Sequence, residues 1–562
     1  MEPRSPSKFK LPIVGFIHYR QAWKIGIALI VVFLLLVGIY HAFKSGRNFN
    51  MLGRSYFSVV VDCGSTGTRI NVYKWMIKDV NNRDLPILVH SYPDNSTKSP
   101  ISKVGCQYHC MQTEPGLDKF VGNSSGVRAS LEPLILWAEQ QIPSERHGET
   151  PMFILATAGL RQLPIEDARR ILEDAEAVVK EHSFMYRKSW IRVLSGKEEA
   201  YYGWLALNYK MGSLENSSAL HTLGVLDLGG SSLQVVMEID NSREREHLVR
   251  SNIGSIEHQI LAYSLPAFGL NEAFHRTVVM LSQVQSIRES SGGPFELKHP
   301  CLSSGFVQNY TCNGCFGPNT TDWKNSGQMW NNHMTSVYLV GDPNWDQCKE
   351  LARAAAINSS RSEWSQSIIS SNCKAHLSSS SGSNFLNVKA APLPVARFHA
   401  LSGFYAVYNM LNLSARANMT NIWEKGQQLC SRSWADLSRI SGNQNFIGQY
   451  CFRVPYLASL IEDALCLGDA EIYFGPGDVS WTLGAALVEG KYLGPSTTEA
   501  QTSISTLKLR EVVSSPIFLF VLLVCLVFIV YHSQIKLPMP GKKGAAAGAP
   551  LPSYIYPKRC PN

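Results

Sequence analysis

The sequence predicts a mixed α/β fold in the middle of the chain, with one membrane-spanning helix near each end. Two segments, residues 25–43 and 512–531, are apolar, and each approaches the ~20 residues that a helix needs to cross a bilayer. Between them, short apolar runs such as 152–156 and 223–228 alternate with amphipathic stretches such as 164–182. Strands that alternate with helices in this way are typical of α/β proteins.

Positive charges flank the two apolar segments on their outer sides, and they predict the orientation of the chain. These residues are Arg4, Lys8, Lys10, Arg20, Lys24, Lys536, Lys542, Lys543, Lys558 and Arg559. Because basic residues collect on the cytoplasmic side of a membrane, we expect both ends in the cytoplasm and the region between the spans in the secretory lumen or outside the cell. The net charge of +8 is partly due to these tails, so it argues for membrane topology and not for a nucleic-acid partner.

The first apolar segment could instead be a signal peptide. Its apolar core is longer than the roughly 7 to 15 residues of a cleaved signal, and no small-x-small cleavage site follows it cleanly. We therefore interpret residues 25–43 as an uncleaved anchor.

The two spans divide the chain into tails, linkers and a luminal or extracellular region. The expected parts are a cytoplasmic tail (1–24), a span (25–43), a linker (44–55), lobe I (56–219), lobe II (220–490), a linker (491–511), a span (512–531) and a cytoplasmic tail (532–562). We expect two lobes because the region is too long for one hydrophobic core. Lobe II contains a portion, about 290–383, that is rich in Ser, Gly and Asn and holds five cysteines. We expect a disulfide-pinned insertion there, outside the catalytic core.

Cysteine usage agrees with an oxidising compartment. Apart from Cys63, Cys525 and Cys560, ten cysteines lie between the spans: Cys106, Cys110, Cys301, Cys312, Cys315, Cys348, Cys373, Cys430, Cys451 and Cys466. An even number in this compartment predicts up to five disulfides, and the spacing leaves their pairing open. Cys312 and Cys315 form a CxxC without a second CxxC at matched spacing, so we expect a disulfide and not a zinc site.

The glycosylation pattern Asn-x-Ser/Thr is confined to the same region. It occurs at Asn95, Asn123, Asn216, Asn309, Asn319, Asn358, Asn412 and Asn418. Acceptor sites between the spans, and none in the tails, support the predicted topology and indicate a glycoprotein.

Two segments of the region between the spans are similar to each other. They are VVVDCGSTGTRINVY (59–73) and GVLDLGGSSLQVVMEI (224–239). Their alignment pairs Asp62 with Asp227, Gly64 with Gly229, and Arg69 with Gln234. Each segment is predicted to form a strand, a tight turn and a second strand, with a carboxylate at the end of the first strand.

Such a turn is suited to binding phosphate. Glycine lets the backbone come close to a ligand, and successive N–H groups of a turn form a concave anion site. Hydroxyl groups of Ser65, Thr66, Thr68, Ser231 and Ser232 can add donors. Either turn alone could be an ordinary Gly-rich hairpin, but two turns with equal internal spacing argue against that interpretation. A Walker A loop is absent, because residues 195–197 contain Gly-Lys without the required first glycine and final hydroxyl.

The two aspartates predict a metal cofactor. A carboxylate and a phosphate repel each other, so their proximity makes sense if a hard divalent cation, Ca²⁺ or Mg²⁺, lies between them. We expect Asp62 and Asp227 to hold it through its water molecules.

Five segments in order resemble the apyrases, that is, the ecto-nucleoside triphosphate diphosphohydrolase family. They are VDCGSTGTR (61–69), ATAGLR (156–161), SGKEEAYYGW (195–204), LDLGGSSLQ (226–234) and FHALSGFYAVYNML (398–411). The terminal spans and the C-terminal segments are similar to those of plant membrane-bound apyrases. The resemblance implies two actin-like (RNase H-like) lobes, as in the actin and hexokinase ATPase superfamily, with a nucleotide cleft between them.

The resemblance also implies roles for individual residues. Glu199 would be the catalytic base, and Ser232 and Gln234 would orient the attacking water with it. Phosphate or nucleotide binding would fall to Ser65, Thr66, Gly67, Thr68, Arg69, Thr157, Ala158, Arg161, Gly229, Gly230, Ser231 and Tyr405.

Three of these assignments have a structural alternative. Glu198 and Glu199 are adjacent, and either could be only a helix-start residue. Ser195 would cap this helix with Glu198 at the third position, and Glu199 would then point elsewhere. Arg161 could form a structural ion pair. Tyr405, next to Phe404, could belong to the core and not stack on the base.

We therefore expect a membrane-anchored, metal-dependent hydrolase that removes terminal phosphate from nucleoside tri- or diphosphates by direct attack of water. The alternatives are a sugar kinase or polyphosphatase on the same scaffold, or a non-catalytic nucleotide sensor. The sequence leaves open the choice between ATP or ADP and UDP or GDP, the choice between Golgi and plasma membrane, and the oligomeric state.

Overall fold

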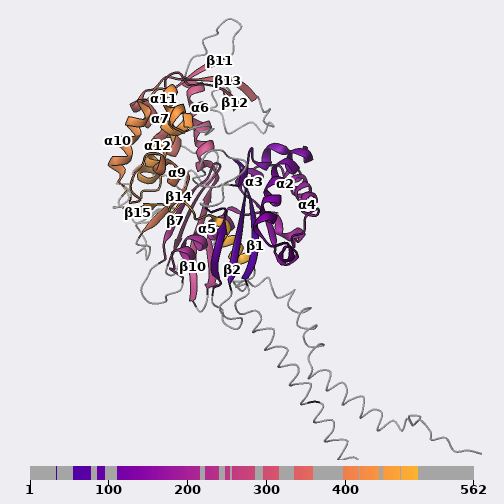
Figure 1. Ribbon diagram of the computed structural model, residues 1–562. Coiled ribbons are helices and arrows are strands. Elements are labelled where there is room, and N and C mark those ends of the chain that lie inside the picture. Colours follow the sequence, from indigo (N-terminus) through magenta and orange to yellow (C-terminus); the bar gives the residue numbers. More distant parts are fainter. Residues whose placement is uncertain are drawn as a thin grey trace, which may run out of the picture. The chain divides into compact units, whose positions relative to one another are not determined.

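The computed structural model in Figure 1 divides into two compact units, Asn48–Ser496 and the two chain ends Met1–Arg47 and Thr497–Asn562. Apart from Phe33, all described residues lie in Asn48–Ser496. The structure describes residues 33, 55–76, 85–94, 111–214, 222–239, 247–253, 256–284, 295–315, 334–357, 397–416, 418–441, 447–468 and 470–490.

The predicted spans, 25–43 and 512–531, lie outside the described residues apart from Phe33, and they stay predictions, as do the tails. Among the helices that the structure does describe, none combines the length and the apolar character needed to cross a bilayer. Four of the predicted glycosylation sites are described, and all four are exposed: Asn123, Asn309, Asn412 and Asn418. Glycosylation itself stays a prediction.

The first sheet has six strands, in the order β3-β2-β1-β5-β6 with β4 beside β2. They are β1 (Ser55–Cys63), β2 (Thr68–Met76), β3 (Ile87–Tyr92), β4 (Gln112–Thr113), β5 (Met152–Ala156) and β6 (Ile191–Val193). β1 and β2 form an antiparallel hairpin, whereas β5 runs parallel to β1 and β6 parallel to β5. The run predicted at 152–156 is β5, and the helix predicted at 164–182 is α4 (Ile165–Val179).

The second sheet repeats this arrangement in the order β15-β14-β7-β8-β10-β9. Its strands are β7 (Gly224–Leu228), β8 (Leu233–Glu238), β9 (Leu248–Ile253), β10 (Ile256–Leu265), β14 (Phe398–Ser402) and β15 (Ile472–Phe474). In both sheets a hairpin lies at the centre, with a further antiparallel strand beside its second strand and two parallel strands beside its first. The predicted α/β fold is confirmed, and its central unit occurs twice.

Two helices, α5 (Gly196–Lys210) and α13 (Trp481–Glu489), pack against each other between the two sheets (Figure 1). One hydrophobic cluster joins Val60 of the first sheet to Val236 of the second sheet through Trp204 of α5. The helix α13 falls within the predicted lobe II, yet it packs on α5 and on β1 of the first sheet. The last described helix therefore packs against the first described strand.

The outer faces of the sheets carry the remaining helices. The first sheet is covered by α2 (Ser124–Gln141), against which α4 packs. The second sheet and the region beyond it carry α6 (Leu270–Val284), α7 (Trp345–Ile357), α9 (Gly403–Met410), α10 (Met419–Cys430), α11 (Trp434–Ser441) and α12 (Tyr450–Ser459). Each outer face has its own hydrophobic cluster, so both central sheets are buried on both sides.

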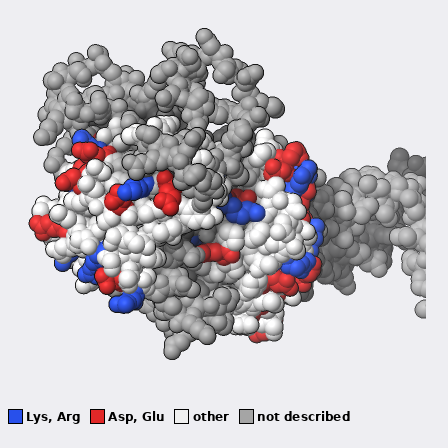
Figure 2. Space-filling model, turned by 90° about the horizontal axis from the view of Figure 1, so that it is seen from above, with Lys and Arg blue, Asp and Glu red and all other residues white. Residues whose placement is uncertain are grey.

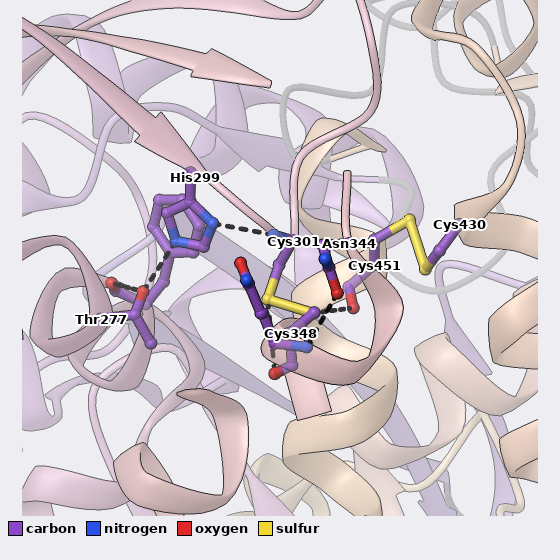
Figure 3. Close-up of a disulfide and its surroundings, with 9 residues drawn as sticks. Thr277, His299, Cys301, Asn344, Cys348, Cys430 and Cys451 are labelled. Atoms are coloured by element: carbon purple, nitrogen blue, oxygen red, sulfur yellow. Dashed lines mark hydrogen bonds between the residues drawn. A yellow bond between two sulfur atoms is a disulfide. The ribbon is translucent and has the colours of Figure 1, made fainter. Parts of the chain in front are cut away.

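A third sheet lies within the predicted insertion and has the order β11-β13-β12. Its strands are β11 (Phe295–His299), β12 (Val307–Asn313) and β13 (Met334–Gly341). Disulfides pin this region, as expected. Cys301 bonds to Cys348, and Cys430 bonds to Cys451 nearby (Figure 3). Cys312 bonds to Cys315. The predicted disulfide within the CxxC is therefore confirmed.

Buried His299 connects the third sheet to α6, as Figure 3 shows. The Cys301 N–H donates to His299 Nδ1 over 3.1 Å, and Thr277 Oγ1 lies 3.0 Å from His299 Nε2. Burial lowers the pKa of His299 to about 3, so this ring is a neutral part of the core.

Charged side chains are interspersed on the face in Figure 2, where neither sign forms a large continuous patch over the described atoms. An example is the α4 surface, on which Arg169 pairs with both Glu166 and Glu173. This pattern is that of an ordinary solvated surface.

Candidate active site

The two Asp-Gly segments form equivalent hairpins, as their alignment predicts. Asp62 at the end of β1 lies opposite Arg69 of β2. Asp227 at the end of β7 lies opposite Gln234 of β8. In both hairpins the same position faces the aspartate, and only the chemistry of the residue there differs.

The turns that close these hairpins contain the same hydrogen bond. The Gly64 N–H donates to the Gly67 carbonyl over 3.1 Å, and the Gly229 N–H donates to the Ser232 carbonyl over 2.9 Å. Both turns therefore reverse the chain within four residues, a geometry that can aim successive N–H groups at an anion.

Strand alternation turns both aspartates toward α5. In β1, Val60 belongs to the cluster around α5, and Asp62, two residues later, points to the same face. In β7, Val225 belongs to that cluster, and Asp227 follows it in the same way. A Cβ atom added to Gly203 of α5 would lie 4.0 Å from Asp227 Oδ2, so the helix leaves room for this carboxylate.

The tips of the two turns approach one another. A Cβ atom added to Gly230 would lie 2.7 Å from Thr66 Cγ2, 3.0 Å from Asn271 Nδ2 and 3.2 Å from Ser65 Oγ. A Cβ atom here would force the Thr66 side chain to shift, so glycine allows the two turns to approach this closely. The structure thus brings together three predicted phosphate-binding residues and adds Asn271, which the sequence did not indicate.

Glu199 lies in the first turn of α5 and is held by Arg161. The Arg161 Nη2–H donates to Glu199 Oε2 over 2.8 Å, and its Nη1–H donates to the Leu194 carbonyl over 3.0 Å. The ATAG segment reaches the same place, because the Thr157 N–H donates to the Cys63 carbonyl at the end of β1 over 3.2 Å. The ion pair that was one interpretation of Arg161 is present, and its partner is the predicted base.

The neighbouring carboxylate, Glu198, caps α5. The Ser195 hydroxyl accepts from the Glu198 N–H over 3.2 Å, and Glu198 Oε2 accepts from the Ser195 N–H over 2.8 Å. Glu198 also pairs with Arg192 over 2.9 Å. The capping interpretation therefore applies to Glu198, and Glu199 is left to face Arg161 and the two hairpins.

The environment of Glu199 favours a proton on its carboxyl group. Burial raises the pKa of Glu199 to about 7, Arg161 opposes this shift, and the charges of Asp62 and Asp227 add to it. A group with a pKa near neutrality is suited to general base catalysis.

Gln234 and Ser232 contact each other at the end of β8. The Gln234 Nε2–H donates to Ser232 Oγ over 2.7 Å and to Ser264 Oγ over 3.1 Å. Both predicted water-orienting groups are buried. Ser264 lies opposite Gln234 in β10, and sequence reasoning missed it. The available indication was a hydroxyl residue between Tyr263 and Leu265 in an apolar strand.

The two aspartates differ in their partners. Asp62 Oδ2 lies 3.6 Å from Arg69 Nη1, whereas buried Asp62 Oδ1 has no hydrogen-bond partner. Burial raises the pKa of Asp62 to about 6, with Arg69 opposing and Asp227 adding to the shift. Burial also raises the pKa of Asp227, and a hydrogen bond with Ser402 opposes that shift.

These carboxylates fit a hydrated divalent cation. Asp62 Oδ1 is a buried acceptor without a partner, and burial penalises the charge on both aspartates. A cation nearby would relieve both conditions. Within the described part of the chain, no group of three or more His, Cys, Asp or Glu side chains is arranged to bind a metal. Two carboxylates suit an ion that keeps most of its water, as Mg²⁺ commonly does.

Thr68 and Cys63 point away from the site. They share a face of their strands with Ile70 and Val61, in the cluster that packs beneath α2. The Thr68 side chain is fully buried and its hydroxyl has no partner. Burial raises the pKa of Cys63, which keeps it unreactive. The structure thus brings the Thr68 backbone to the turn, and not its hydroxyl group.

The two aromatic residues of the fifth segment, Phe404 and Tyr405, lie in different environments. Phe404 is fully buried in the core behind the second sheet, so the core interpretation applies to it. Tyr405 is only partly buried, and its ring lies against the loop that contains Gly475 and Gly477. A Cβ atom on Gly477 would be 2.4 Å from Tyr405 Cε1.

Curated proteins of known sequence include relatives of this chain. The probable apyrase 7 of Arabidopsis thaliana is 39% identical over 481 residues, which are 84% of this chain and 62% of that protein. The nucleoside-diphosphatase mig-23 of Caenorhabditis elegans is 24% identical over 544 residues, 90% of each chain. The chain thus spans less than two thirds of the length of the first relative.

The fold is also found in a solved structure. The crystal structure of nucleoside triphosphate hydrolases from Neospora caninum matches with a TM-score of 0.52 and 14% identity, over 83% of this chain and 98% of that one. This similarity shows that the two chains share a fold. The family model described as GDA1/CD39 (nucleoside phosphatase) matches residues 52–498. The expectation from the five segments is confirmed: this chain belongs to the GDA1/CD39 nucleoside phosphatase family.

Proposed function

We propose that this protein hydrolyses nucleoside tri- or diphosphates, or both, to lower phosphates and orthophosphate by direct attack of water. The observation that carries the proposal is the pair of equivalent hairpins whose aspartates face buried Glu199. Family membership and the apyrase and nucleoside-diphosphatase relatives support hydrolysis of nucleotide phosphoanhydrides.

The two turns would hold the phosphate chain. Backbone N–H groups of the first turn, Ser65 to Thr68, and of the second, Gly229 to Ser231, can surround phosphoryl oxygens. Arg69 already donates to Thr66 Oγ1 over 3.0 Å, so its guanidinium group lies at the first turn. Thr157 and Ala158, at the end of β5, would complete the phosphate site.

Glu199 would take a proton from the attacking water. The water oxygen forms a bond to the terminal phosphorus, the bond from that phosphorus to the bridging oxygen breaks, and the lower nucleotide leaves. Ser232 and Gln234 would orient this water, because a hydroxyl and an amide can both accept from water and donate to a phosphoryl oxygen. Arg161 holds Glu199 over 2.8 Å and would also meet the phosphate.

The residues that would hold a cation are Asp62 and Asp227, through its water molecules. When bound, Ca²⁺ or Mg²⁺ supplies positive charge that neutralises phosphoryl oxygens and the departing phosphate. The partnerless Asp62 Oδ1 supports this assignment.

Tyr405 would stack on the base. Its ring is partly buried and lies against a loop with two glycines, Gly475 and Gly477. Aromatic stacking tolerates every base, so it does not choose between adenine, uracil and guanine.

We also propose that the enzyme is anchored by two spans, 25–43 and 512–531, with lobes I (56–219) and II (220–490) in the secretory lumen or outside the cell. The apolar segments and the basic tails support this topology. Disulfides of the region between the predicted spans support an oxidising compartment.

The test is a hydrolysis panel on the full-length protein in detergent. Phosphate release from ATP, ADP, UTP, UDP, GTP and GDP would be measured with Ca²⁺ or Mg²⁺ and with a chelator. We expect release that the chelator abolishes and that Glu199→Gln lowers by about 10²- to 10⁴-fold. Asp167→Asn, at a partly exposed position of α4, is the control. Transfer to sugars in place of water, or release from polyphosphate alone, would contradict the proposal, as would nucleotide binding without turnover.

A further inference from the structure

Ser402 has a strained backbone at the junction of β14 and α9. Its φ is 51° and its ψ is −116°, which is the conformation of the first central residue in a type II′ turn. Glycine dominates that position because a Cβ atom is unfavourable there. Such strain persists only where the surrounding structure enforces it, and it is concentrated at functional sites.

The hydroxyl group of Ser402 does not serve the helix that follows it. Serine is favoured at the N-cap because its side-chain oxygen accepts a hydrogen bond from the first turn. Ser402 is the N-cap residue of α9, yet it makes no such bond. It is instead hydrogen-bonded to the Asp227 carboxylate. Ser402 is therefore strained, and its side chain does not form the usual N-cap hydrogen bond.

The packing of β14 explains how this geometry arises. β14 is parallel to β7, with Leu401 opposite Asp227 and Ser402 opposite Leu228. A Cβ atom on Gly403 would lie 2.6 Å from the Leu228 carbonyl oxygen, so α9 begins directly against the end of β7. Ser402 must therefore reverse the chain at one residue, and this reversal leaves its hydroxyl group at the carboxylate.

We propose that Ser402 is a positioning residue for Asp227. Its hydroxyl donates to one carboxylate oxygen and so holds the other oxygen toward the water shell of the bound cation. This inference rests on the function proposed above, in which Asp227 orders that water. Groups that hydrogen-bond to a metal site's carboxylates orient them and tune affinity for the metal. Asp62 lacks such a hydroxyl partner among the described side chains, and its Oδ2 lies 3.6 Å from Arg69 Nη1.

Two substitutions separate this role from a structural one. Ser402→Ala removes the hydroxyl and keeps the strain, whereas Ser402→Gly removes both. If the hydroxyl positions Asp227, the Mg²⁺ concentration for half-maximal phosphate release should be at least about tenfold higher in both variants than in the wild type. A non-hydrolysable imidodiphosphate nucleotide should stabilise the protein against heat in a Mg²⁺-dependent way, and the Mg²⁺ concentration at the midpoint of this effect should shift by the same factor. Because Ser402→Gly also relieves the strain, its melting temperature should be higher than that of Ser402→Ala.

The matched control is Ser58→Ala. The buried Ser58 hydroxyl accepts from Trp75 Nε1–H over 2.9 Å, so this variant should lose thermal stability while both Mg²⁺ midpoints stay at the wild-type value.

A folded Ser402→Gly protein with wild-type Mg²⁺ midpoints would overturn the inference, and this variant carries the test if Ser402→Ala fails to fold. Failure of the proposed function looks different, because then the wild-type protein itself would release no phosphate with Mg²⁺.

Discussion

The two central hairpins share one backbone plan and differ in the residue that faces the aspartate. In the first hairpin this residue is Arg69, a permanent positive charge, and in the second it is Gln234, a neutral amide. Arg69 contacts Asp62 and Thr66, whereas Gln234 contacts Ser232 and Ser264. A duplicated scaffold can therefore supply two different chemical functions from the same position.

The surroundings of the two aspartates extend this difference. The first aspartate, Asp62, has the Arg69 guanidinium group beside one oxygen, and its other oxygen has no hydrogen-bond partner. The second, Asp227, has the hydroxyl of Ser402, supplied by a third strand. On the function proposed above, the residue that faces the aspartate would bind phosphate in the first hairpin and orient water in the second. The following variants test that division.

The largest expected effect comes from replacing the residues that face the aspartates, Gln234 and Arg69, with alanine. Gln234→Ala should lower kcat by about 10²- to 10³-fold, as loss of a transition-state donor does, with little change in KM. Arg69→Ala should mainly raise KM, because it removes a charge from the phosphate site. Gln259→Ala, on the neighbouring strand β10, is the control. Steady-state kinetics on the preferred nucleotide would measure both, and equal kcat losses would show that the hairpins are not specialised.

The next effect concerns the aspartates. Asp62→Asn and Asp227→Asn should each raise the Mg²⁺ concentration for half-maximal activity by about 10- to 100-fold. The amide keeps the shape of the side chain and removes the charge that holds the hydrated cation. Metal titrations of the two variants would measure this. If only one variant responds, the cation is held by one hairpin and not by both.

A smaller effect is expected at the glycines of the second turn. Gly230→Ala would place Cβ 2.7 Å from Thr66 Cγ2, whereas Gly229→Ala would meet only the Ser232 carbonyl oxygen at 3.2 Å. Gly230→Ala should therefore push the two turns apart and raise KM about tenfold, or about 1.4 kcal/mol. Gly229→Ala should have a weaker effect. The reverse order would mean that the turns do not approach each other in solution.

The smallest effect is on the pH dependence of stability without metal. Burial raises the pKa of Asp62 from 3.8 to about 6 and that of Glu199 from 4.5 to about 7. Between pH ~4 and about 7 the folded chain then binds more protons than the unfolded chain. The contribution of these two groups to the free energy of unfolding is therefore greatest below pH ~4 and falls as the pH rises to about 7. Thermal unfolding with chelator should show this fall, and Glu199→Gln should reduce it. A melting temperature that rises over this range in the wild type, but not in Glu199→Gln, would contradict the assignment.

Much of the site followed from sequence because local rules determine it. The alignment of Asp62 with Asp227 predicted two hairpins with equal spacing, and the structure has the same register in both. The Ser195 to Glu198 spacing predicted a capping box, and α5 begins with one. Turns and caps involve residues that are close in the chain, so their sequences are informative without a fold.

Side-chain direction was harder to predict near the turns. The Gly-rich segment suggests that the Thr68 hydroxyl donates to phosphate. Thr68 is already part of β2, however, and its side chain points beneath α2. Strand alternation would have excluded that role only if the first residue of β2 had been known. A shift of one residue moves a side chain to the other face.

By itself, the sequence determined the α/β class, the two hairpins, the helix that presents Glu199, and the family of the chain. Only the tertiary structure decided that Glu199 pairs with Arg161, that Gln234 meets Ser264, and that Ser402 bends out of a third strand to meet Asp227. The reason is physical. Repeated turns and helix starts are encoded over a few neighbouring residues. These three contacts instead join residues far apart in the chain, and strand pairing and helix packing bring them within hydrogen-bond reach.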